Sequence, residues 1–248
     1  MVLLIVLLIP APILSLVQGI ANVIDEKGLK ATATGKLPQK LCKVLFEEYR
    51  IEKVGNILSK FLKVSKEDDF YDLQVARLVM ELTGLLRKTK GRFFLTKKYN
   101  KVMSDSGTAG LYPILFAGFC TKFNWAYADG YDEIPFIQHS FLFSMYMLHK
   151  FGNTKIPLEE YQTRFLQAFP MVIHEVITDS NYCTEEEECR RCYSHRALDK
   201  FLWFMGLANI EHINNSKDPR PYQNGNRVIE KLPLLNAVVQ FNFQSNHQ

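Results

Sequence analysis

The feature that most constrains the fold is a glycine–leucine pair that follows helix-like apolar patterns at three places. The pairs are Gly28-Leu29, Gly84-Leu85 and Gly206-Leu207. Glycine readily adopts the left-handed conformation that ends many helices, and the leucine after it can return to the protein interior. Short strand-like segments follow each pair. We therefore predict that each glycine joins a helix to a small β-hairpin.

The second pair has the fullest pattern, over residues 68–104. A helix-period apolar run ends at Gly84, a short basic turn follows, and Phe93-Phe94-Leu95 forms a short apolar strand. Thr96 is then suited to cap the next helix, and Thr34 has the same place after the first pair. A helix, a hairpin and a new helix in this order are typical of a winged-helix unit.

The repeat sets our prediction of the fold. Aligning the second and third pairs places Val79 on Phe201 and Leu82 on Phe204. We predict a mainly α-helical fold with small β-hairpins, in which tandem winged-helix-like units surround an aromatic helical core. The 248 residues divide into two such units over 1–106, a helical block rich in aromatic residues over 107–170, and a third unit over 171–248. The alternative is chance recurrence of the pair in a helical protein.

The net positive charge of the chain is small, but basic residues are concentrated in one stretch. The net charge is only +4, from 30 basic and 26 acidic residues, which by itself does not indicate a nucleic-acid partner. One stretch, however, contains seven basic residues and no acidic residue: Arg87, Lys88, Lys90, Arg92, Lys97, Lys98 and Lys101. A basic hairpin followed by a helix start can bind phosphates. The alternative is a solvated surface that keeps an edge hairpin from pairing with other chains.

The sequence contains no catalytic motif. It lacks a Gly-x-Ser-x-Gly elbow, a phosphate-binding loop and a dinucleotide fingerprint, so we assign no catalytic residue and no small-molecule substrate. We predict a non-enzymatic binding module that contacts nucleic acid through the basic hairpin. A helix over residues 36–49 offers Gln39, Lys40 and Lys43 as further contacts. The alternative is a protein–protein interaction adaptor, since winged helices also serve as partner surfaces.

Four potential zinc ligands lie within thirteen residues: Cys183, Cys189, Cys192 and His195. Thiolate and imidazole are the ligands of structural zinc, although this spacing matches no known zinc motif. The intervening Glu185–Glu188 run is expected to be a solvated loop. A zinc-binding protein is therefore the third hypothesis, and otherwise we expect no cofactor.

The N-terminal residues are apolar, and Met1–Ile24 contains no charged side chain. Residues 1–9 are compatible with a signal, an anchor or a truncated start. Beyond Pro12, however, apolar residues recur at helical spacing, as in an amphipathic helix of the folded domain. We therefore predict a cytoplasmic protein without membrane association. Export through the apolar N-terminus is the alternative.

Three segments resemble a group of uncharacterised bacterial proteins. They are residues 29–41 (LKATATGKLPQKL), 82–97 (LTGLLRKTKGRFFLTK) and 123–129 (FNWAYAD). In that group, similar segments follow a domain named after a plasmid open reading frame of mobile elements. The resemblance implies a bacterial cytoplasmic protein of winged-helix character with no established activity, and it provides no catalytic residues.

Overall fold

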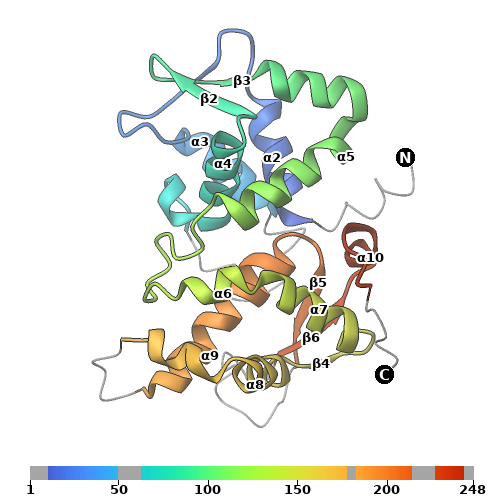
Figure 1. The fold of residues 1–248 in the computed structure, drawn as a ribbon. Helices are drawn as coiled ribbons and strands as arrows, with labels where there is room; N and C mark the ends of the chain where they lie inside the picture. The colour runs from blue at the N-terminus through green and yellow to red at the C-terminus, as the bar shows by residue number, and fades with distance from the viewer. Residues whose placement is uncertain (1–10, 50–62, 178–182, 214–226, 243–248) are drawn as a thin grey trace. The chain divides into compact units, whose positions relative to one another are not determined.

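The structure, a computed structural model, describes residues 11–49, 63–177, 183–213 and 227–242. It is mainly helical with two small antiparallel sheets of three strands each, as predicted (Figure 1). The chain divides into two compact units, Met1–Phe123 and Asn124–Gln248. This division does not coincide with the expected boundaries after residues 106 and 170, and the aromatic block is shared between the units.

The described residues of the first unit form a short sheet and four main helices. Its helix α2 presents Ile13, Leu16 and Ile20 to the core, which confirms the predicted amphipathic helix, and it packs on α3 and α4. The three strands pair in the order β1-β3-β2. The elements are α2 (Pro12–Asn22), β1 (Leu29–Lys30), α3 (Gln39–Tyr49), the 3₁₀ helix η3 (Glu67–Asp69), α4 (Tyr71–Leu82), β2 (Leu86–Thr89), β3 (Arg92–Leu95) and α5 (Lys97–Thr121).

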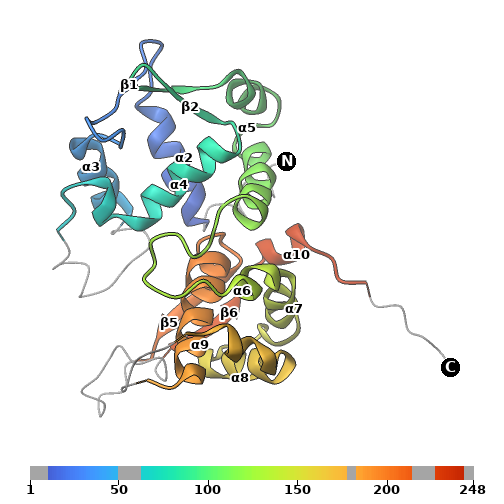
Figure 2. The same cartoon turned by 60° about the vertical axis from the view of Figure 1, so that its left-hand side comes forward.

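Helix α5 consists of two arms. Gly107 has a left-handed φ of 59° and breaks the helical geometry between them. The sequence predicts separate helices over 97–104 and 108–127, so the position of the break is confirmed. Figures 1 and 2 show that the second arm turns back towards α4, and α5 packs on that helix.

The second unit repeats the order of the first. A helix, a two-residue strand, a second helix, a 3₁₀ helix, a third helix and a hairpin follow one another, and the strands pair in the order β4-β6-β5. The elements are α6 (Pro135–His139), α7 (Phe141–Phe151), β4 (Ile156–Pro157), α8 (Leu158–Ala168), the 3₁₀ helix η4 (Pro170–Glu175), α9 (Glu185–Tyr193), the π-helix η5 (Ser194–Trp203), β5 (Ala208–His212), β6 (Arg227–Lys231) and α10 (Leu234–Val238).

Gly84 and Gly206 are the same joint in the two units. Their φ angles are 71° and 72°. In each case the next leucine donates its backbone N–H to the carbonyl five residues earlier, Leu85 to Met80 at 2.9 Å and Leu207 to Leu202 at 2.8 Å. This is the 6→1 bond that closes a helix ending in a left-handed residue. Strands β2 and β5 begin directly after these leucines, so the predicted joint is confirmed at both positions.

Gly28 differs from the other two glycines. Its φ is also positive, at 73°, but α2 ends six residues earlier and β1 does not form a hairpin of its own. Leu29 and Lys30 instead pair with Phe93 and Arg92 of β3. The expectation of a separate first unit is therefore wrong, because a two-residue strand takes its hydrogen bonds from the later hairpin. Thr34 does not cap a helix either, since α3 begins at Gln39.

The aromatic residues form core contacts within each unit. In the second unit the ring of Phe165 stacks on Tyr193 with centroids 4.0 Å apart, and Phe136, Phe143 and Phe169 surround it. In the first unit Phe119 and Phe123 stack at 5.4 Å. The predicted aromatic core is thus present in the helices of both units. No helix among the described residues is long and apolar enough to cross a membrane.

Candidate nucleic-acid interface

The strand register places Arg87 and Arg92 of the hairpin on a common face with Lys30 of β1. Residues directly opposite in an antiparallel pair project to the same side of the sheet. Lys30 and Thr89 both lie opposite Arg92, and Arg87 lies opposite Phe94. These five residues therefore form one face, which we call the basic sheet face. The opposite face contains Phe93, which is fully buried and packs into the core of the first unit.

The tip of the hairpin holds a lysine in a strained conformation. Lys90 and Gly91 link β2 to β3 with φ angles of 48° and 69°. Two successive positive φ angles are typical of the type I′ turn that best matches the twist of a two-residue hairpin. Glycine adopts such an angle freely, whereas lysine does so rarely. The turn thus presents the exposed ammonium group of Lys90 at the end of the hairpin.

Three of the predicted basic residues brace the sheet. Arg92 donates hydrogen bonds to the carbonyl oxygens of residues 27 and 28, at 3.0 and 2.6 Å. The ammonium group of Lys88 donates to the Gly35 carbonyl at 3.0 Å. The guanidinium of Arg87 lies 5.1 Å from the centre of the Phe94 ring. These contacts fix the side chains while leaving their positive charge without a carboxylate partner among the described residues.

Three other lysines are exposed and form no hydrogen bond or ion pair within the part of the chain that the structure describes: Lys90, Lys97 and Lys101. Lys97 and Lys101 are one helical turn apart at the start of α5. Thr96 caps this helix by accepting a hydrogen bond from the Tyr99 N–H at 3.2 Å, as predicted. The helix dipole adds positive potential at that end. We call these residues the free lysines.

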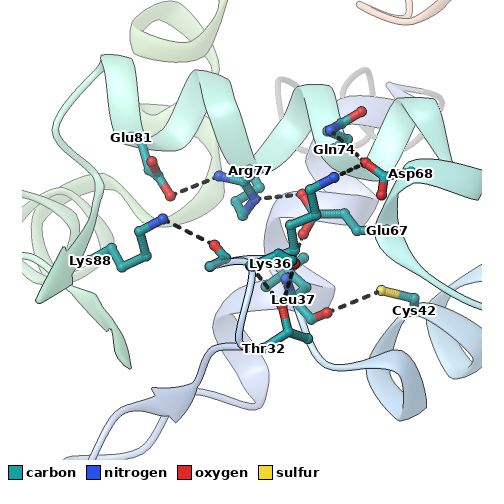
Figure 3. Close-up of polar contacts among 12 residues, drawn as sticks. Thr32, Lys36, Leu37, Cys42, Glu67, Asp68, Gln74, Arg77, Glu81 and Lys88 are labelled. Atoms are coloured by element: carbon teal, nitrogen blue, oxygen red, sulfur yellow. Dashed lines mark hydrogen bonds and ion pairs between the residues drawn. The ribbon is translucent and has the colours of Figure 1, made fainter. Parts of the chain in front are cut away.

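A buried ion pair supports the loop beside the hairpin (Figure 3). Glu67 is fully buried and accepts hydrogen bonds from the Arg77 guanidinium, at 2.6 Å, and from the Leu37 backbone N–H. Pairing with Glu67 and Glu81 raises the pKa of Arg77, although its burial alone would lower it. Lys36 pairs with Asp68 at the surface. Residues 32–37 are thereby held where the Gly35 carbonyl meets Lys88.

Helix α4, which precedes the hairpin, offers no surface for reading bases. Most of its side chains are buried, including Leu73, Val79 and Met80. The more accessible positions are apolar or acidic, such as Leu82 and Glu81. The predicted contacts on α3 are accessible, because Gln39, Lys40 and Lys43 are all exposed.

The structure does not bring the four potential zinc ligands together. In the described ranges, no group of three or more His, Cys, Asp or Glu residues lies where it could hold a metal ion. Cys189 and Cys192 are buried on one face of α9, and burial raises their pKa values to about 11 and about 12. Cys183 is partly exposed before the helix. His195 lies in η5, where burial lowers its pKa and its ring is 5.5 Å from that of Tyr131.

The acidic run Glu185–Glu188 is the first turn of α9 rather than the predicted loop. Thr184 accepts a hydrogen bond from the Glu187 N–H at 3.2 Å, and the Glu187 carboxylate accepts one from the Thr184 N–H at 2.9 Å. This capping box and the negative charges both stabilise a helix N-terminus.

Sequence reasoning missed one buried ion pair in the second unit. Arg196 is 1% exposed and forms a two-pronged contact with Asp129, at 2.7 and 3.1 Å. Its guanidinium also donates to the carbonyls of Tyr131 and Asp132. These contacts hold the 129–132 turn against η5. The position of Arg196 inside an apolar helical pattern was the feature of the sequence that could have indicated this ion pair.

The comparisons with known proteins concern the first unit. Residues 10–108 match the family model of the Y4jL N-terminal domain, a segment that runs from the start of α2 to the break in α5 and contains the whole basic sheet face. The match covers less than half of the chain and shows no link to plasmid open-reading-frame proteins. Comparisons with curated proteins and with solved structures give no match.

Proposed function

We propose that the first unit is a winged-helix domain that binds the phosphate backbone of nucleic acid. The observation that carries the proposal is the set of free lysines, which are exposed at the tip of the hairpin and at the start of the next helix. Arg87–Lys101 contains no acidic residue to neutralise them. Contacts of this kind provide affinity without reading the sequence of bases.

The order of the elements supports the winged-helix part of the proposal. The described residues run helix, strand, helix, helix, strand, strand, and β1 pairs with the last strand. In this arrangement the β2–β3 hairpin is the wing. Because α4 is buried, we expect the wing and the start of α5 to make the contact. The expected binding therefore has low sequence specificity.

The second unit has the same order of elements but a different charge. The face of its sheet that corresponds to the basic sheet face contains Asn209, Glu211 and Glu230, and Lys155 pairs with Glu211 at 2.6 Å. We therefore assign nucleic-acid binding to the first unit alone. Protein–protein contact is the second candidate, and it is favoured by two strongly exposed apolar residues of the second unit, Met171 at 71% and Ile177 at 78%.

Fluorescence anisotropy with labelled duplex and single-stranded DNA at low salt tests the proposal. The variant Lys90→Ala/Lys97→Ala/Lys101→Ala removes the free lysines. The matched control, Lys27→Ala/Lys63→Ala/Lys66→Ala, removes three exposed lysines of the same unit that lie outside the hairpin, α5 and the predicted contacts on α3. We expect the first variant to weaken binding about tenfold or more and the control to change it about twofold at most.

Two results would overturn the proposal. Wild-type protein that binds neither DNA at low salt would remove nucleic acid as the partner and leave protein contact as the remaining candidate. A control variant that weakens binding as much as the first variant would remove the hairpin as its location.

A further inference from the structure

A groove lies beside the C-terminus of α4 in the first unit. Its volume is about 350 Å³, which is within the usual range of small-molecule sites. The break at Gly107 turns the second arm of α5 back, so that residues from both ends of this helix line the same groove. The lining residues include Lys98, Pro113, Ile114, Ala117, Thr121 and Lys122.

Two ammonium groups meet at this groove. Lys98 donates a hydrogen bond to the Thr83 carbonyl at 2.8 Å, and Lys122 donates to the Leu82 carbonyl at 3.4 Å. These carbonyls belong to consecutive residues, so both ammonium groups are bound at the C-terminal end of α4. A lysine ammonium has three N–H donors. Lys98 and Lys122 each donate one of them to a carbonyl, which leaves two for a ligand. No carboxylate among the described residues pairs with either amine.

The walls between the two lysines are mostly apolar. Pro113 has no backbone N–H, and Ile114 and Ala117 add only hydrocarbon surface. Gly118 lets α5 approach closely, because a β-carbon at this position would clash with the Thr83 methyl group. The groove therefore combines apolar walls with two cations whose remaining donors can bind an anion.

We propose that this groove binds a small monocarboxylate with an apolar body. The carboxylate would accept charge-assisted hydrogen bonds from Lys98 and Lys122, and the apolar body would lie on Pro113, Ile114 and Ala117. The volume fits a small molecule rather than a length of folded chain. This binding activity is separate from the contact with nucleic acid, because the groove does not include Lys90, Lys97 or Lys101.

Isothermal titration calorimetry with decanoate tests the proposal, with decan-1-ol as the uncharged analogue and inorganic phosphate as the anion without an apolar body. Decanoate should bind more tightly than either comparison compound. Lys98→Met/Lys122→Met should reduce decanoate affinity about tenfold and remove the preference over the alcohol. Circular dichroism of each variant confirms folding.

A variant that fills the groove tests whether decanoate binds there and not elsewhere on α5. Ala117→Phe should fill the groove and lower decanoate affinity at least about tenfold. Ser104→Phe adds the same ring at an exposed position of the same helix outside the groove and should leave the affinity unchanged.

Equal binding of decanoate and decan-1-ol, binding of phosphate alone, or no effect of Ala117→Phe would each overturn the proposal. DNA anisotropy of the Ala117→Phe protein should match that of the wild type. The two experiments therefore distinguish a failure of the proposal about the groove from a failure of the proposal about nucleic-acid binding.

Discussion

The buried pair of Glu67 and Arg77 permits the sharpest prediction about stability. In Glu67→Ala the Arg77 guanidinium, whose side chain is 6% exposed, keeps only the Glu81 carboxylate. The Leu37 backbone N–H also loses its acceptor. Removing one partner of a buried ion pair leaves an uncompensated charge and costs about 3–5 kcal/mol. Because Arg77 retains Glu81, we expect the loss in free energy of unfolding near 3 kcal/mol, the lower end of that range.

Urea denaturation followed by two probes tests this value. Both tryptophans, Trp125 and Trp203, belong to the second unit, so tryptophan fluorescence provides an internal reference. Far-UV circular dichroism reports helices of both units. The dichroism transition assigned to the first unit should move to lower urea in Glu67→Ala.

The double variant Glu67→Met/Arg77→Met completes the test. It removes the unpaired charge and should recover part of the lost stability, since apolar replacement of a buried pair is often close to neutral. A loss below about 1 kcal/mol in Glu67→Ala, or a double variant as unstable as the sum of the two single variants, would refute this reasoning.

Three further predictions concern the joint, the thiols and pH. Gly84→Ala should cost about 1–2 kcal/mol from left-handed strain alone, since no atom lies within 4 Å of the added β-carbon; an unchanged urea midpoint would contradict this. Ellman's reagent at pH 8 should react quickly with Cys183 only, because the other four cysteines are buried, and protein purified under reducing conditions should hold less than about 0.2 equivalents of zinc. Two fast thiols or stoichiometric zinc would contradict this. Burial lowers the pKa of His195, so below its ordinary value of about 6.5 the unfolded chain binds a proton that the folded chain does not. Stability should therefore fall as the pH decreases below about 6.5 and should fall less in His195→Gln, as measured by urea midpoints between pH 5 and 7.5; equal slopes would contradict this.

Local patterns in the sequence predicted the joints and hairpins well. The hairpins after Gly84 and Gly206 form as predicted, because a left-handed glycine and an apolar strand each act within a few residues, as does the capping Thr96 after the first of these hairpins. The sequence also located the seven basic residues on the hairpin and on α5. Which of them are free was not predictable, since Arg92 and Lys88 are bound by carbonyls more than fifty residues away.

Long-range pairing accounts for the features that were missed. Strand β4 has only two residues and is stabilised by pairing with Ile229 and Val228, so no local signal marks it. Gly28 has the same local pattern as Gly84, yet the strand after it forms no hairpin of its own and pairs instead with the distant strand β3. The number of units thus depends on strand partners rather than on glycine motifs. The expectation about residues 1–9 lies outside the described residues.

The salt dependence of DNA binding tests the central claim most directly. A protein that neutralises phosphates releases counterions, so the logarithm of its affinity for duplex DNA falls with the logarithm of salt concentration, with a slope of about −0.9 for each contact. If the free lysines each contact one phosphate, the slope of Lys90→Ala/Lys97→Ala/Lys101→Ala should be less steep than that of the wild type by about 2.7. Equal slopes for the two proteins would show that these lysines do not contact the backbone.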